Sequence, residues 1–298
     1  MPTPAPAALR HQAEAASLAL PPLLIAAERV ASAVVQGTHG RRRVGQGEAF
    51  WQFRQYEPGD SLSRIDWRET AKSQHVYVRE TEWEAAQSVF LWCDASPSMD
   101  YASSREGPTK RARADLLTLA LAALLARGGE RVTLMGSGLP PSHGRAVLDR
   151  LALLLERRGA AAGLPEFEQL PRHGQTVWLG DFLAPLEEIN ERVLRHANQG
   201  VKGHLLQILD PAEETLPFSG RVRFEGLEAE SPLLVSRVES IRGAYEQKLA
   251  HHRAGLAALT RLAGWSFGTH RTDHPPQHAL LALWRALAKS QAMRLQPC

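Results

Sequence analysis

The chain has 298 residues, of which 44% are hydrophobic, and its formal net charge is +3. This hydrophobic content fills a sizeable core and excludes wholesale disorder, while so small a basic excess does not indicate a nucleic-acid binder. The two cysteines, Cys93 and Cys298, give no disulfide framework, and we expect Cys93 to be a small buried side chain in a reducing compartment.

The first 84 residues show few signs of a packed core. Residues 1–22 are rich in alanine and proline and are predicted to form a disordered tail. Residues 23–84 are predicted to contain a helix over 23–36, a loop over 37–47 and then an extended, β-rich element with a strand over 75–79. Three charges make a weak electrostatic footprint, so a solvated loop or an acidic partner is favoured over nucleic acid for the arginines of the loop, Arg41, Arg42 and Arg43.

Residues 85–298 alternate between strand and helix patterns. Strands are predicted over 88–93, 131–135, 176–180, 204–209 and 265–270, helices over 110–126, 146–157, 186–199, 237–263 and 276–289, and a hairpin from 221–224 and 233–236. This alternation predicts an α/β fold with a doubly wound, mostly parallel sheet covered on both faces. Because no apolar run is long enough for a membrane span and no secretory signal is visible, we expect a cytoplasmic protein.

The first of these strands runs into a loop of oxygen donors, Asp94, Ser96 and Ser98. One carboxylate and two hydroxyls suit a hard divalent cation, and Mg²⁺ favours such donors together with several waters. Ligands in open α/β sheets bind at the carboxyl ends of the strands, where this loop is expected to lie. The alternative is a structural role in which Asp94 caps the turn by accepting backbone N–H bonds. The sequence leaves both interpretations open.

An ordered series of motifs connects the chain to a known family. It comprises Gly47-Glu48-x-Phe50, Arg54-x-Tyr56-x-Pro58-Gly59-Asp60, Arg64-Ile65-Asp66-Trp67, Thr70-Ala71-Lys72, Val78-Arg79, Glu82 and Asp94-x-Ser96-x-Ser98-Met99. The series closely resembles the bacterial family called domain of unknown function 58 (DUF58), whose members look like von Willebrand factor type A domains. The resemblance implies that residues 85–298 form a von Willebrand A-like domain. Family members often accompany MoxR-type AAA+ ATPases, which implies such an ATPase as the partner.

The resemblance also implies a metal-ion-dependent adhesion site (MIDAS) built from three loops. Asp94, Ser96 and Ser98 match the first loop, and Asp181, which follows the strand over 176–180, fits the third. The second loop supplies a threonine in von Willebrand A domains, but residues 158–174 contain neither Thr nor Ser. We therefore expect either a water in place of that hydroxyl or weak binding of Mg²⁺.

The charged and aromatic residues of the motif series admit a catalytic and a structural interpretation. We favour the structural one, in which arginine–carboxylate pairs hold an extended segment in register and Trp67 anchors it by burial. It applies to Arg54, Tyr56, Pro58, Gly59, Asp60, Arg64, Asp66, Trp67 and Arg79. Asp210 and Glu213, which follow a later strand, are expected to cap a turn rather than line the metal loop.

Three functions are compatible with these observations. The favoured one is a non-enzymatic protein-interaction adaptor, in which a partner's carboxylate completes the coordination of Mg²⁺. A metal-dependent hydrolase or phosphatase is less favoured, because Ser96 stands where an aspartyl-phosphate enzyme would need a second Asp and no Walker A sequence occurs. The third is a metal-free structural scaffold, which metal-independent binding of the partner would distinguish from the first.

Overall fold

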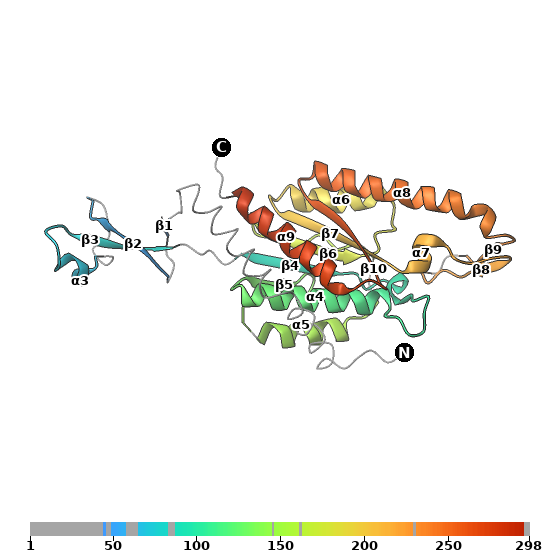
Figure 1. The fold of residues 1–298 in the computed structure, drawn as a ribbon, viewed down its shortest axis with the longest axis horizontal. Helices are drawn as coiled ribbons and strands as arrows, with labels where there is room; N and C mark the ends of the chain where they lie inside the picture. The colour runs from blue at the N-terminus through green and yellow to red at the C-terminus, as the bar shows by residue number, and fades with distance from the viewer. Residues whose placement is uncertain are drawn as a thin grey trace. The chain divides into compact units, whose positions relative to one another are not determined.

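The structure is a computed structural model that describes residues 44–45, 49–57, 65–82, 87–144, 146–160, 163–228 and 231–294 (Figure 1). The tail predicted over 1–22, the helix predicted over 23–36 and the arginines at 41–43 lie outside these residues. The chain divides into two compact units, with a boundary in sequence between Ala86 and Gln87.

The smaller unit contains a three-stranded antiparallel sheet in the order β1-β3-β2, formed by β1 (Val44–Gly45), β2 (Ala49–Gln55) and β3 (Tyr77–Glu82). The β-rich element expected here is therefore confirmed. The predicted loop over 37–47 is wrong at Val44–Gly45, which pairs with β3, and the strand predicted over 75–79 begins two residues later. A single helical turn, α3 (Trp67–Thr70), begins where the Asp66 side chain accepts hydrogen bonds from two backbone N–H groups.

The larger unit is built on a five-stranded parallel sheet in the order β10-β7-β6-β4-β5. Its strands are β4 (Ser88–Cys93), β5 (Arg131–Leu134), β6 (Gln175–Gly180), β7 (Lys202–Leu209) and β10 (Ser266–Arg271). The chain starts in β4, moves to β5 at one edge, and then continues from β6 on the other side of β4. The strand order therefore reverses between β4 and β6. At such a switch point the connections diverge and leave a crevice at the carboxyl ends of the strands.

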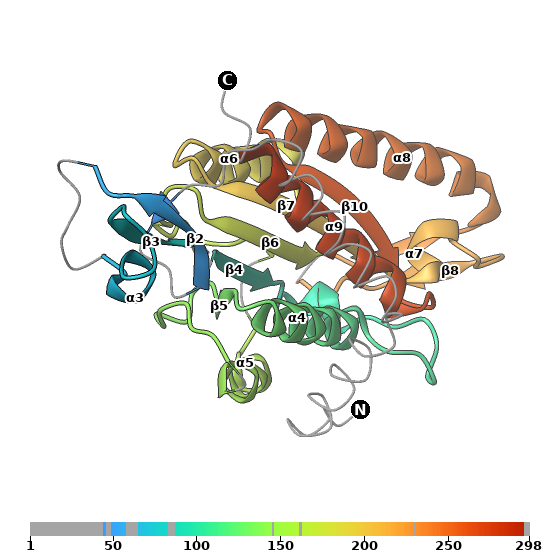
Figure 2. The same cartoon turned by 60° about the vertical axis from the view of Figure 1, so that its left-hand side comes forward.

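Helices cover both faces of this sheet, as Figures 1 and 2 show. The alternating residues of β4 explain the two layers, because Val89, Leu91 and Cys93 pack on one face while Phe90 packs on the other. The first face is covered by α4 (Lys110–Arg127), α5 (Ala146–Arg157) and α9 (Pro276–Arg294), and the second by α6 (Leu186–Ala197) and α8 (Glu239–Leu262).

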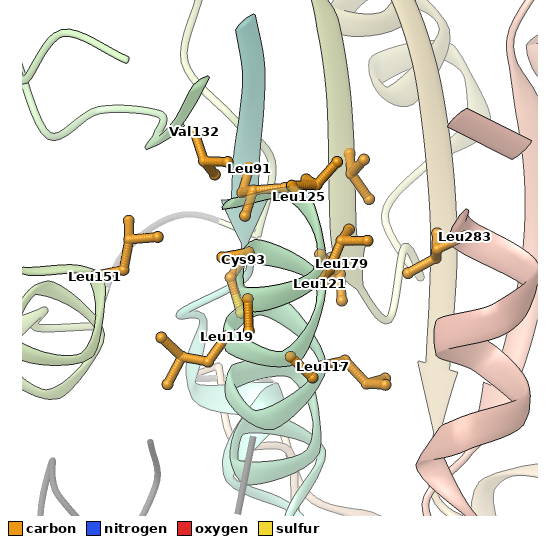
Figure 3. Close-up of a cluster of buried hydrophobic side chains, with 14 of the residues drawn as sticks. Leu91, Cys93, Leu117, Leu119, Leu121, Leu125, Val132, Leu151, Leu179 and Leu283 are labelled. Carbon is orange, nitrogen blue, oxygen red and sulfur yellow. The ribbon is translucent and has the colours of Figure 1, made fainter. Parts of the chain in front are cut away.

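The core under α4 shows how the sequence produces this packing. In Figure 3, Leu117, Leu121 and Leu125 of α4 lie one helical turn apart and face Leu91 of β4 and Leu179 of β6. Each fully buried leucine stabilises the fold by about 1.5–3 kcal/mol relative to an exposed one. Cys93 is buried within the same cluster, as predicted.

The predicted fold class is confirmed: the unit is an α/β domain with a doubly wound parallel sheet, consistent with a von Willebrand A-like fold. The hairpin is confirmed as the antiparallel pair β8 (Val222–Phe224) and β9 (Leu233–Val235). Two short helices were not expected: the 3-10 helix η2 (Pro97–Asp100) and α7 (Pro211–Thr215). Within the described part of the chain, no helix is long and apolar enough to cross a membrane.

Candidate functional site

The candidate site lies at the switch point, where β4 and β6 end side by side. Asp94 directly follows β4, and Asp181 directly follows β6. The backbone N–H of Asp94 donates to the carbonyl of Leu179 at 2.8 Å, so the β4–β6 pairing continues to the first residue of the loop. Both carboxylates are buried, with 0% of Asp94 and 6% of Asp181 exposed. The structure therefore brings together two carboxylates that lie far apart in the sequence.

The loop after β4 is held rigidly by backbone and side-chain contacts. Asp94 Oδ1 accepts a 2.7 Å hydrogen bond from the Ser96 N–H. Arg111, on α4, donates from Nη2 to the carbonyls of Ala95 and Ser96 at 2.9 and 3.1 Å, and its Nε lies 2.5 Å from an oxygen of Asp100. One oxygen of Asp94 thus does cap the turn, as the structural interpretation expected. The other oxygen, Oδ2, is buried and has no hydrogen-bond partner among the described residues.

The hydroxyl groups of the loop form a chain with a defined direction. Ser98 Oγ donates to Asp181 Oδ2 at 2.7 Å, and Ser96 Oγ lies 3.0 Å from Ser98 Oγ. Because Ser98 has a single hydroxyl hydrogen and gives it to a carboxylate, Ser96 must be the donor in the Ser96–Ser98 contact. Both hydroxyl hydrogens are therefore used within the chain, which explains why neither reaches Asp94 Oδ2. Ser96 Oγ and Ser98 Oγ each keep at least one lone pair that could bind a cation.

The electrostatics of the site favour a cation. The pKa of Asp94 is raised to about 6: burial is the main cause, the Ser96 N–H bond acts in the opposite direction, and the negative charge of Asp181 adds to the rise. An ionised carboxylate oxygen that is buried without a partner is costly unless a positive charge balances it. The unpartnered Asp94 Oδ2, beside two hydroxyl oxygens, is a hard-oxygen donor set that fits one Mg²⁺ ion with waters in its remaining positions.

The second loop, over residues 158–174, contains neither Thr nor Ser, and its residue Gly163 lies beside the site. A Cβ atom on Gly163 would lie 3.6 Å from Ser96 Oγ and 3.8 Å from Asp94 Oδ2, so a side chain at this position would point toward the donors. Gly180 lies on the other side, where a Cβ would come within 3.0 Å of Asp94 Oδ2 and would crowd it. The described residues contain no group of three or more His, Cys, Asp or Glu side chains that could hold a metal ion. Any cation here therefore depends on the serine hydroxyls.

Sequence analysis missed Glu228, whose Oε1 accepts from the Ser98 N–H at 3.3 Å, and Lys110, the first residue of α4. Lys110 is the more deeply buried of the two. Its side chain is 0% exposed, and its Nζ lies 2.9 Å from Asp181 Oδ2 and 2.6 Å from Glu213 Oε1. Burial acts to lower the pKa of Lys110, but the two carboxylates outweigh it, and the pKa is raised above its ordinary value. The signal available in the sequence was a lysine in the first turn of an apolar helix, where the helix dipole disfavours a positive charge unless acidic groups surround it.

The prediction that Asp210 and Glu213 cap a turn rather than line the site holds for the cap and is wrong for Glu213, which also reaches the site. Asp210 Oδ1 accepts from the Ala212 N–H at 2.8 Å, and Glu213 Oε2 accepts from the Asp210 N–H at 2.8 Å, which together form a capping box at the start of α7. Glu213 also reaches the site through its second oxygen, which binds Lys110. Burial raises the pKa of Glu213, and the Lys110 charge opposes that rise.

The motif residues of the smaller unit do not form a second charged centre within the described ranges. Arg54 lies 3.8 Å from Glu57 at the surface, Asp66 caps α3, and Tyr56 is half-buried. The prediction that Trp67 anchors the segment by burial is wrong: the side chain is 67% exposed, because Trp67 opens the single turn of α3. Arg79 pairs with Phe53 in the β2–β3 register. Four motif residues fall outside the described residues: Pro58, Gly59, Asp60 and Arg64.

Comparisons with known proteins place this geometry in context. The family model described as "Protein of unknown function DUF58" matches residues 52–255. The uncharacterized proteins Mb1516 of Mycobacterium bovis and Rv1480 of Mycobacterium tuberculosis are each 28% identical over 256 residues, which cover 80% of this chain and 80% of each relative. Among solved structures, the conserved hypothetical protein BatB from Bacteroides thetaiotaomicron aligns with a TM-score of 0.40 and 13% identity, over 69% of this chain and 98% of that one. An aerotolerance-related membrane protein from Bacteroides fragilis gives a TM-score of 0.37 and 15% identity, over 68% and 99% of the two chains.

Proposed function

This chain belongs to the DUF58 family, and from that premise we propose that it is a non-enzymatic protein-interaction adaptor with a Mg²⁺-assisted site at Asp94. The observation that carries the proposal is the buried, unpartnered Oδ2 of Asp94 at the switch point of the parallel sheet. A site at this position lies at the carboxyl ends of the strands, where α/β sheets bind ligands.

The residues that would hold the ion are Asp94, through Oδ2, and the hydroxyls of Ser96 and Ser98. Asp181 fixes the orientation of the Ser98 hydroxyl by accepting its hydrogen. When bound, Mg²⁺ supplies a compact positive charge with exchangeable water positions, and one of these can be taken by a carboxylate of a partner protein. The von Willebrand A resemblance of the motif Asp94-x-Ser96-x-Ser98 supports this MIDAS type of binding.

The contacts of the site support binding rather than chemistry. A serine nucleophile needs a neighbouring base that can accept its proton. The oxygen that Ser98 contacts, Asp181 Oδ2, already accepts a hydrogen bond from the Lys110 ammonium. Lys110 is itself held between two carboxylates with a raised pKa, so it is a donor and not a base. We therefore propose no hydrolase or phosphatase activity for this site.

The proposed partner is a MoxR-type AAA+ ATPase, and the proposed compartment is the cytoplasm. The partner rests on the family, whose members often accompany such ATPases. The same fold could instead serve as a metal-free scaffold. The contacts of Lys110 favour that second candidate, because they give Asp181 a positive partner without any metal.

Binding of a purified MoxR-type ATPase from the same organism, measured by biolayer interferometry, tests the proposal. Because the ATPase requires Mg²⁺ with its nucleotide, removing the metal with EDTA would disturb both proteins, so the comparison is made between variants at constant Mg²⁺. We expect Asp94→Asn and Ser98→Ala to weaken binding by about tenfold or more. Asp149→Asn, an exposed carboxylate on α5, serves as the control and should bind like the wild type.

Three results would separate the candidates. Loss of binding in the two site variants alone supports the metal-assisted adaptor. Equal binding by every variant would leave an adaptor whose site is metal-free, which is the scaffold hypothesis. Failure of the wild type to bind the ATPase at all would contradict the proposed partner.

A further inference from the structure

Lys110 is the most unusual side chain of the larger unit, because a charged group is completely buried at the first position of a helix. Its Nζ contacts carboxylates from two other elements, Asp181 at the end of β6 and Glu213 of α7. Lysine is almost never fully buried unless it is paired. The ammonium thus connects α4, β6 and α7 at the edge of the sheet where the candidate cation site lies.

The ammonium and a divalent cation would compete for the same acidic surroundings. Asp181 Oδ2 already accepts hydrogen bonds from Lys110 and from Ser98, so direct coordination of a metal there would bring two positive centres close together. Charges of the same sign repel strongly at such a separation inside a protein. Asp94 Oδ2, in contrast, has no hydrogen-bond partner among the described residues, and the Lys110 ammonium is hydrogen-bonded to Asp181 and Glu213 instead. A divalent cation bound at Asp94 Oδ2 would therefore share no ligand oxygen with the Lys110 ammonium.

From this arrangement we infer that Lys110 is a built-in cation of the site, which holds Asp181 and Glu213 in place without metal and restricts an added divalent cation to the Asp94 side. This inference rests on the proposed function in so far as it concerns added Mg²⁺. It makes Lys110 a positioning residue that also sets the metal affinity: the ammonium keeps the site assembled, and its charge weakens the binding of the ion. The wild-type site is then a weak Mg²⁺ site that does not collapse when the metal is removed.

The experiment compares Mg²⁺ binding and melting temperature in the wild type, in Lys110→Gln and in Lys248→Gln, an exposed lysine on α8 that serves as the matched control. In EDTA, we expect Lys110→Gln to melt well below the wild type, because Asp181 and Glu213 lose their positive partner. Added Mg²⁺ should raise the melting temperature of Lys110→Gln far more than that of the wild type. Isothermal titration with Mg²⁺ should show binding about tenfold tighter or more, because a neighbouring positive charge has been removed.

A second variant keeps the test valid if Lys110→Gln does not fold. Lys110→Gln combined with Glu213→Gln removes one of the two carboxylates that Lys110→Gln alone leaves without a positive partner. The same increase in Mg²⁺ affinity is expected in this double variant, and adding Asp94→Asn should abolish it.

The outcomes for the inference and for the proposed function differ. If the wild type binds Mg²⁺ and the Lys110 variants bind it no more tightly, the inference is overturned while the proposed site stands. If only the Lys110 variants bind Mg²⁺, Lys110 is the resident cation, the inference holds, and the metal-assisted function fails in favour of the scaffold. Absence of Mg²⁺ binding in all variants would overturn both.

Discussion

Replacing Asp94 by Asn should remove the pH dependence of stability that this buried carboxyl gives to the metal-free protein. Its folded-state pKa of about 6 lies above the ordinary value of 3.8, so the folded protein keeps a proton that the unfolded chain has already released. The free energy of unfolding of the wild type therefore falls as the pH rises through this interval. The total loss is about 3 kcal/mol, and about 2 kcal/mol of it lies between about pH 4.5 and about pH 8.

Asn preserves the geometry of the loop, because its side-chain oxygen can accept the hydrogen bond that Asp94 Oδ1 receives from the Ser96 N–H. Its amide nitrogen would stand at the position of Oδ2, where burial without an acceptor costs about 1–3 kcal/mol. That cost does not change with pH, since the amide does not titrate. The difference in free energy of unfolding between the wild type and Asp94→Asn therefore changes with pH only through the buried Asp94 charge.

Urea denaturation in EDTA across this pH range measures the effect, with Asp149→Asn as the control for an exposed carboxylate. The stability of Asp94→Asn relative to the wild type should rise by about 2 kcal/mol between about pH 4.5 and about pH 8, and the control should show no such trend. Saturating Mg²⁺ should remove the trend by stabilising ionised Asp94 in the wild type alone. A difference that stays constant within about 0.5 kcal/mol would refute the assignment of an unbalanced buried carboxylate.

Three further substitutions test other parts of the structure. Gly163→Ser should tighten Mg²⁺ binding several-fold in a calorimetric titration, because its hydroxyl would point toward the cation donors, whereas an unchanged affinity would place the second loop out of reach. Arg158→Ala leaves the Asp115 carboxylate buried without its ion-pair partner and should lower the free energy of unfolding by about 3–5 kcal/mol; a loss under about 1 kcal/mol would contradict a buried pair. Gly203→Ala should destabilise by about 1–3 kcal/mol or more in thermal denaturation, because its Cβ would lie 2.2 Å from the Trp265 ring, and wild-type stability would contradict that packing.

The strands and helices of the larger unit could be predicted because burial imposes a period on the sequence. The five core strands and the five long helices occur where the apolar pattern placed them, with ends that differ by a few residues. The short helices η2 and α7 have no such period, since local contacts determine them, together with a side-chain cap in α7. The capping box of α7, Asp210-x-x-Glu213, was nonetheless readable as a helix start. The exposure of Trp67 was not, because four residues of helix give no hydrophobic face to interpret.

From the residues alone the site was predictable only as far as one loop, and Asp181 was predicted from the resemblance to von Willebrand A domains. Asp94, Ser96 and Ser98 are neighbours in sequence, so their convergence follows from the turn itself. Asp181 joins them because β6 pairs with β4, and that order of strands is a property of the whole sheet. Lys110 was missed for a similar reason, since its acidic partners come from the end of β6 and from α7. The sequence pattern could not show which charged side chains of the site are paired, because pairing depends on distances between elements that are remote in sequence.

The site differs from the adhesion-type pattern at Gly163 and at Lys110, and each difference should weaken Mg²⁺ binding for its own reason. A double variant tests whether the two effects are independent. Gly163 removes a ligand hydroxyl beside Asp94, whereas Lys110 adds a positive charge beside Asp181. Because the two residues contact different carboxylates, the gains in binding free energy from Gly163→Ser and Lys110→Gln should add within about 0.5 kcal/mol in the double variant. A gain in the double variant no larger than that of Lys110→Gln alone would show that the ion, once Lys110 is removed, moves to Asp181 and away from the second loop. The additive result would instead keep the ion on the Asp94 side, where the unpartnered oxygen lies.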